Sequence, residues 1–130
     1  MAGMSPTHGF RLKRVYEPAS PEDGLRVLVD RLWPRGLSKD KAHVDLWLKE
    51  TAPSDELRRH FHADTRSPEQ RWDDFRAAYV AELEQEPARS AAEELKTRAR
   101  SGLVTLLYAA KDEHWNNAMA LKAWLEGRKG

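Results

Sequence analysis

The sequence predicts an α/β fold, with a small, mostly parallel sheet that carries helices on both faces in three layers. Two apolar runs, residues 26–30 and 103–110, are continuous rather than alternating, as in strands that are buried on both faces. Helical patterns fill most of the chain between these runs and follow the second one. A strand, several helices, a strand and a helix in this order are typical of a parallel sheet.

The first part of the chain is predicted to hold short strands separated by turns. Residues 10–16 fit a short strand with interleaved basic residues, and residues 26–30 fit a second strand. Proline and glycine residues follow both segments and end them. Ser38 is expected to cap a short helical turn, and residues 44–48 fit either a strand or the end of that turn.

The middle of the chain is predicted to be helical. Ser54 is a candidate N-cap for a short helix. Ser67, Pro68 and Gln70 form a capping-box pattern at the start of a second helix, which has an apolar stripe at helical spacing. Pro87 begins a third helical segment, and a glycine ends it before the next strand.

Length and composition limit the kind of protein. The chain has 130 residues and fits one domain, because single cores of about 100–150 residues are the commonest. We expect a loose tail over residues 1–9 and a single domain over residues 10–130. Charged residues make up 33% of the chain, but five Trp and several apolar runs argue against disorder. The net charge of +1 disfavours nucleic acid and anionic membranes as partners.

The absence of cysteine excludes several kinds of chemistry. Disulfides, thiolate nucleophiles, Cys-ligated zinc and iron–sulfur clusters all require this residue. We expect a cytoplasmic protein, because the lack of cysteine fits a reducing compartment and neither a secretion signal nor an apolar run of about 18 residues is found. The sequence has no Gly-rich phosphate loop, nucleophile elbow or zinc signature, and no cofactor is predicted.

The two buried strands both end in polar clusters. Residues 30–35 follow the first strand, and residues 111–117 follow the second, where a last helix is expected over residues 114–126. Ligands of open parallel sheets bind outside the carboxyl ends of the strands, where polar side chains can first sit on a rigid frame. We therefore expect the two clusters to line one site.

Positive and amide groups in the clusters suit an anion. Arg31 and Arg35 present guanidinium forks that match phosphate or carboxylate, and Lys111 adds a further positive charge. Asn116 and Asn117 are expected to donate to a bound anion from the first turn of the last helix, whose N-terminus attracts negative charge.

Five further residues belong to the predicted site. Asp30 and His114 are candidates for a general acid or base, and Tyr108 is expected to place its hydroxyl in the same pocket. Trp33 and Asp112 complete the set. Structural alternatives stay open, because Asp30 can cap a loop or pair with an arginine, Asp112 can cap the last helix, and Trp33 can fill an edge of the core.

No metal site is predicted. Asp30, Asp112 and Glu113 could hold Mg²⁺ if the two loops meet, but the neighbouring arginines already offer partners to these carboxylates. His60 and His62 lie in a segment that looks like a helix end, where their side chains would diverge.

Three functions stay open at this point. The first is a protein that binds a small anionic ligand, carrying phosphate or carboxylate, at the carboxyl ends of its strands. The second is an enzyme that acts on such a ligand, with Asp30 or His114 as the acid or base. The third, disfavoured by the net charge, is a nucleic-acid or protein interaction module. Its charged and stacking side chains would be Arg31, Trp33, Arg35 and Trp115.

Two segments carry a resemblance to a known family. RVLVDRLWPRG at 26–36 and LLYAAKDEHWNNAMAL at 106–121 resemble the motifs of the bacterial domain of unknown function 488, in its YeaO-like branch. APSDELRRHF and RWDDFRAAYVAEL also resemble it, so the resemblance covers nearly the whole chain after the first nine residues. It implies a small cytosolic α/β domain and a site at the motif positions, without a specific activity. These positions are Asp30, Arg31, Trp33, Arg35, Tyr108, Lys111, Asp112, Asn116 and Asn117.

The chain departs from this resemblance at two positions. Relatives in the branch often carry histidine directly before the two asparagines, where this chain has Trp115, with His114 displaced by one residue. One residue on a helix corresponds to about 100° of rotation. More distant relatives carry a cysteine where this chain has Tyr108, so thiolate chemistry is not available here.

Overall fold

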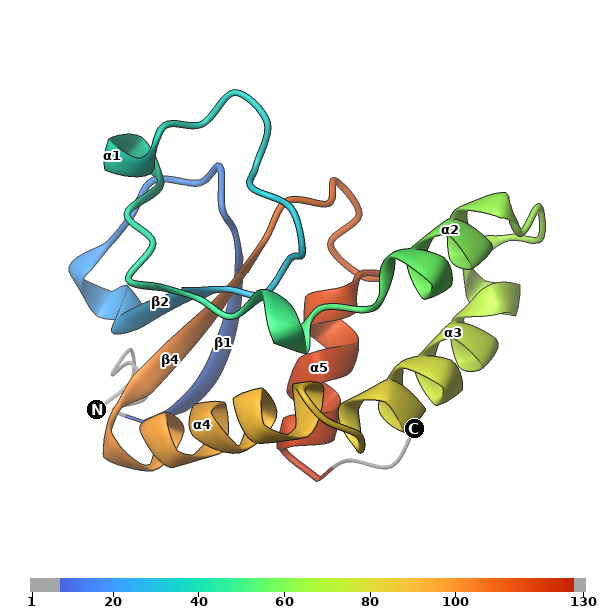
Figure 1. The fold of residues 1–130 in the computed structure, drawn as a ribbon. Coiled ribbons are helices and arrows are strands. Elements are labelled where there is room, and N and C mark those ends of the chain that lie inside the picture. The colour runs from blue at the N-terminus through green and yellow to red at the C-terminus, as the bar shows by residue number, and fades with distance from the viewer. Residues whose placement is uncertain (1–7, 128–130) are drawn as a thin grey trace, which may run out of the picture.

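The fold is built on a four-stranded sheet in which all neighbouring strands are parallel, as a computed structural model of residues 8–127 shows (Figure 1). In spatial order the strands are β1 (Gly9–Arg14), β4 (Leu103–Tyr108), β2 (Leu25–Leu28) and β3 (Leu46–Trp47). Strand β4 lies between β1 and β2, and all of its residues are buried. The predicted α/β class is confirmed. Residues 1–7 of the expected tail lie outside the described residues, and Gly9 already belongs to β1.

Five α-helices and two short 3₁₀ helices complete the described part of the chain. They are η1 (Pro21–Asp23), α1 (Lys39–Ala42), η2 (Lys49–Thr51), α2 (Asp55–Ala63), α3 (Pro68–Leu83), α4 (Ala88–Ser101) and α5 (Asn117–Leu125). The predicted N-caps Ser38, Ser54 and Ser67 each accept a backbone N–H at a helix start, and the capping box of Ser67 and Gln70 is complete.

The two faces of the sheet are covered unequally. Leu83, Leu95 and Leu121 of α3, α4 and α5 pack in one core with side chains of β2 and β4. On the opposite face, Leu28 and Leu107 pack with Ala42 of α1 and with the loops around it. The expected three layers therefore consist of a thick helical layer, the sheet, and a thin layer of loops and single helical turns. Helices α2 and α3 run alongside each other beyond the sheet edge (Figure 1).

The strands end earlier than the apolar runs predict. The last pairing bonds lie just after the strands, where the N–H of Val15 donates to the carbonyl of Tyr108 at 2.8 Å and the N–H of Val29 donates to that of Leu107 at 3.1 Å. Asp30 therefore lies beyond the sheet. Because of this, the alternation of side chains along β2 does not determine which way the Asp30 side chain points.

The last helix begins at Asn117 rather than at His114. One oxygen of Asp112 accepts the backbone N–H groups of His114 and Trp115 at 2.9 and 3.0 Å, which folds these residues into a turn. Asn116 is the N-cap, because its Oδ1 accepts the N–H of Met119 at 2.8 Å. The expected cap by Asp112 thus stabilises the turn before the helix and not the helix itself.

A buried ion pair joins η1 to β2. The side chains of Asp23 and Arg26 are 1% and 5% exposed, with Oδ2 and Nη1 2.5 Å apart. Lys13 of β1 contacts the same carboxylate at 3.1 Å, and Arg26 also donates to two carbonyls at the end of α1. Burial by itself raises the pKa of Asp23, but the N–H of Ser20 and the two cations outweigh burial and lower this pKa below its ordinary value.

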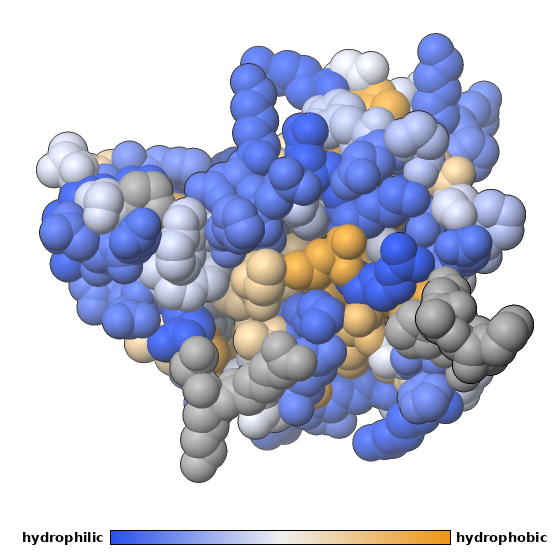
Figure 2. All heavy atoms as spheres, turned by 180° about the vertical axis from the view of Figure 1, so that it is seen from behind, coloured by the Kyte–Doolittle hydropathy of each residue, from blue (hydrophilic) through white to orange (hydrophobic). Residues whose placement is uncertain are grey.

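Ion pairs on the outer surface differ from this buried pair, because their side chains are exposed to solvent. Figure 2 shows a face on which hydrophilic side chains predominate, with a small hydrophobic area near its middle. On α4, Arg98 Nε and Glu94 Oε2 are 2.9 Å apart, and both side chains are 44% exposed. Solvent screens such a pair, so its contribution to stability is small.

Removal of the buried carboxylate should destabilise the fold far more than removal of the exposed one. Asp23→Ala leaves Arg26 charged, buried and without its carboxylate, which we expect to lower the free energy of unfolding by about 3–5 kcal/mol in urea titrations at pH 7. Glu94→Ala should lower it by less than about 1 kcal/mol. Asp23 contributes its full stabilisation of the fold at pH values above its ordinary pKa. This stabilisation is lost as the pH falls through the lower pKa that Asp23 has in the folded state. Equal losses in the two variants would contradict this account.

Candidate functional site

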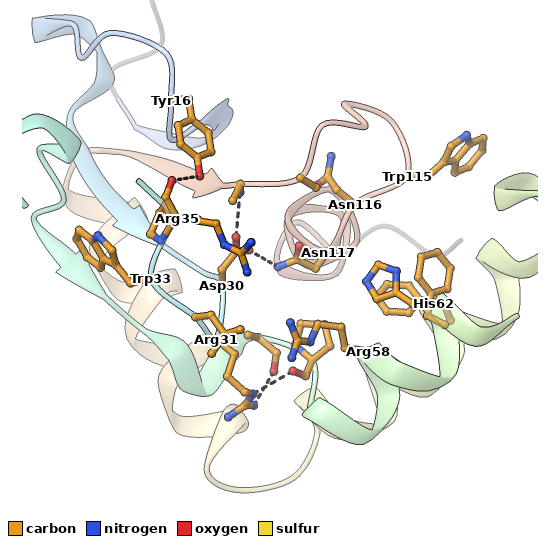
Figure 3. A pocket seen from close by; sticks show the side chains of 18 residues that line it. Tyr16, Asp30, Arg31, Trp33, Arg35, Arg58, His62, Trp115, Asn116 and Asn117 are labelled. Carbon is orange, nitrogen blue, oxygen red and sulfur yellow. Dashed lines mark hydrogen bonds between the residues drawn. The ribbon is translucent and has the colours of Figure 1, made fainter. Parts of the chain in front are cut away.

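A pocket of about 370 Å³ lies beyond the carboxyl ends of β2 and β4 (Figure 3). One side consists of residues 30–35, which follow β2. Residues 109, 110 and 115–117, which follow β4 and begin α5, form a second side, and α2 contributes a third. Residues 30–35 and the last part of the second cluster, residues 115–117, therefore line one pocket although they are far apart in the sequence.

Asp30 connects two sides of the pocket. Its Oδ2 accepts the backbone N–H of Ala109 at 2.9 Å, and its Oδ1 accepts the side-chain amide of Asn117 at 3.1 Å. The same Asn117 nitrogen also donates to the carbonyl of Val29 at 3.2 Å. Burial raises the pKa of Asp30, and these hydrogen bonds and the charge of Arg58 oppose the increase only in part. Within residues 8–127 this carboxylate has no ion pair with an arginine, whereas its bond to the backbone N–H of Ala109 agrees with the alternative that Asp30 caps a loop.

Three arginines line the pocket, and they differ in what holds them. Arg31 is fixed by hydrogen bonds from Nε and Nη2 to the carbonyls of Pro53 and Ala52, both at 3.1 Å. The guanidinium of Arg35 is exposed, and among the described residues it has no hydrogen bond or ion pair. Figure 3 shows the Arg35 side chain extending into the pocket, whereas the end of Arg31 points toward the carbonyls that hold it. Arg58 of α2 is the third arginine, and its Nη2 lies 3.2 Å from Asp55.

Asn116 and Trp33 line the pocket, but their polar atoms already have partners. The oxygen of Asn116 caps α5, and its nitrogen donates to the carbonyl of Asp112 at 3.0 Å. The indole N–H of Trp33 donates to the carbonyl of Leu37 at 2.6 Å, and its ring packs against the smaller core cluster. Asn116 therefore stabilises the helix start, and the expectation that it donates to a bound anion stays a prediction for its second amide hydrogen.

Four of the expected site residues do not line the pocket. Tyr108 is buried in the main core, because its side chain lies on the helix-covered face of β4. Lys111, Asp112 and His114 lie exposed on the turn that precedes α5. This turn carries their side chains away from the pocket, so the structure does not support the positions expected for these four residues.

Helix α2 contributes side chains that the sequence analysis did not include in the site. Arg58, Phe61 and His62 all line the pocket, and so does Phe75 of α3, whose ring packs against Phe61. Their spacing of i, i+3 and i+4 on one helix face is a signal that could have identified them as a group. Tyr16 is a further addition, and its hydroxyl donates to the carbonyl of Arg35 at 2.8 Å.

Within residues 8–127, no three His, Cys, Asp or Glu side chains come together as a group that could hold a metal ion. Asp30, Asp112 and Glu113, which were considered for Mg²⁺, thus do not form such a group. None of the helices in this range combines the length and hydrophobicity needed to cross a membrane.

The pKa of Asp30 provides a test of its hydrogen bonds. Asp30 should titrate above the ordinary value of 3.8, and Asn117→Ala should raise this pKa further, because the charged form loses a donor. Carboxyl-detected NMR titration measures both values. Asp112 is the control, since two backbone N–H groups lower its pKa, and it should titrate below 3.8 in both proteins. Because the folded-state pKa of Asp30 is raised, protonation of Asp30 stabilises the fold below its ordinary pKa, and this contribution is lost as the pH rises through the raised pKa. A pKa of Asp30 at or below 3.8 would contradict the account that burial raises this pKa more than the hydrogen bonds lower it.

Comparison with known proteins places the chain in a family. Residues 9–129 match the family described as "Inactive DUF488-N3 subclade". The uncharacterised protein YeaO of Escherichia coli strain K12 is 44% identical over 116 residues, which is 89% of this chain and 96% of YeaO. The uncharacterised proteins Mb3100c of Mycobacterium bovis and Rv3073c of Mycobacterium tuberculosis are each 41% identical over 118 residues, which is 91% of this chain and 94% of theirs. No solved structure matches significantly. The chain therefore belongs to the DUF488 family and is YeaO-like.

Proposed function

We propose that this protein binds a small anionic ligand, carrying a phosphate or carboxylate group, in the pocket beyond β2 and β4. The observation that carries the proposal is the excess of positive charge, since three arginines and a single Asp or Glu residue line the pocket. A concave site with a few convergent polar groups is the usual form of a small-molecule site.

The state of the arginines supports this proposal. The guanidinium of Arg35 points into the pocket without a carboxylate partner in the described chain. Arg31 is held by two carbonyls, so its orientation is set before a ligand arrives. Guanidinium groups donate to phosphate or carboxylate in a fork geometry, and these charge-assisted bonds are stronger than neutral ones.

The other two functions have less support. A general acid or base at His114 is disfavoured, because His114 does not line the pocket. Both oxygens of Asp30 already accept internal hydrogen bonds, which favours a structural role over proton transfer. The word "Inactive" in the family's description also agrees better with binding than with catalysis. A stacking surface for nucleic acid is disfavoured, because Trp33 packs on the core and the net charge of +1 provides no general attraction for a polyanion.

The proposal is tested by NMR titration with inorganic phosphate, methyl phosphate and acetate in low-salt buffer. We expect shifts centred on residues 30–35 and 109–117, with affinity that falls as NaCl is added. Arg35→Gln should raise Kd about 10-fold or more, because a hydrogen bond to a charged group is lost. Arg89→Gln is the matched control, since it removes one exposed arginine of α4 outside the pocket and should leave Kd unchanged. Absence of binding, or equal losses in the two variants, would contradict the proposal.

A further inference from the structure

We infer that the ligand carries a planar aromatic ring beside its anionic group, and that this ring binds to an aromatic wall of the pocket. The aromatic wall consists of Phe61, His62, Phe75 and Trp115. This inference rests on the proposed function and adds the class of ligand to it.

The aromatic wall is continuous with the core, and this holds its rings in place. The Phe61 and Phe75 ring centroids are 4.6 Å apart, and those of Trp115 and Trp72 are 5.3 Å apart. Phe75 and Trp72 are buried and in contact with each other. Phe61 and Trp115 are only partly buried, so part of each ring is available to the pocket. Rings held by the core lose little freedom on binding, which favours affinity.

Arg35 and the aromatic wall lie on different sides of the pocket, and Tyr16 and Trp33 lie on the Arg35 side. Figure 3 shows Arg35 and Asp30 on one side, and His62 and Trp115 on the other, with Asn117 between them. Arg58 precedes Phe61 and His62 by one helical turn on α2, so positive charge also borders the aromatic wall. A ligand that fills this space has to present an anion toward the arginines and an apolar group toward the rings.

The rings favour an aromatic ligand group over an aliphatic one. Aromatic rings attract one another in stacked or edge-to-face geometries beyond the effect of area burial, with centroids about 4.5–7 Å apart. The contacts within the aromatic wall already have such geometries, with centroids 4.6 Å apart for Phe61 and Phe75 and 6.0 Å apart for Phe61 and His62. The volume of about 370 Å³ lies near the lower end of the range for ligand pockets, which suits one small aromatic anion and not a polymer.

The test compares matched pairs of probes with and without a ring. NMR titration should show that phenyl phosphate binds about 10-fold more tightly than methyl phosphate. Benzoate should bind more tightly than acetate by a similar factor. Trp115→Leu and His62→Ala should each reduce the ratio of the affinity for phenyl phosphate to the affinity for methyl phosphate. Trp124→Leu is the control, because Trp124 is a partly buried tryptophan of α5 that does not line the pocket.

The outcomes separate this inference from the proposed function. Equal affinity for probes with and without a ring overturns the inference and leaves anion binding in place. Absence of binding by all four probes overturns both. If Trp115→Leu does not fold, the exposed His62→Ala variant and the probe pairs on the wild-type protein still decide the question.

Discussion

The site depends on the Asp30 carboxylate, because its two oxygens bond to different parts of the chain. One accepts the N–H of Ala109 just after β4, and the other accepts the amide of Asn117 at the start of α5. The strand order β1-β4-β2-β3 makes this possible, since it places β4 directly beside β2. Asp30 and Ala109 are 79 positions apart in the sequence, yet this bond fixes the distance between two sides of the pocket.

This arrangement leaves two kinds of surface facing the same space. On one side the guanidinium of Arg35 extends into the pocket after the end of β2, and on the other the aromatic wall is held by α2, α3 and the turn before α5. The Asp30 hydrogen bonds set the geometry, whereas the arginines and aromatic rings provide the groups that a ligand would contact. The structure thus separates the residues that build the pocket from those proposed to use it.

The sequence predicted the parts of the fold that depend on local patterns. Continuous apolar runs identified β2 and β4, and the Ser67 capping box identified the start of α3. The meeting of residues 30–35 with residues 115–117 followed from the rule that parallel strands end at the same edge of the sheet.

Other features depend on tertiary contacts that no local pattern contains. Asp112 accepts two N–H groups and thereby displaces the start of α5, which removes His114 from the site. The contribution of Phe61 to the pocket depends on the packing of α2 against α3.

A double-mutant cycle on Asp30→Ala and Asn117→Ala tests the central claim most directly. The free energy of unfolding of the wild type, both single variants and the double variant would be measured in urea. We predict that the two losses are not additive, with a coupling free energy of about 0.5–3 kcal/mol, because each variant removes one partner of the same hydrogen bond. Additive losses would contradict the claim that this hydrogen bond joins the two sides of the pocket.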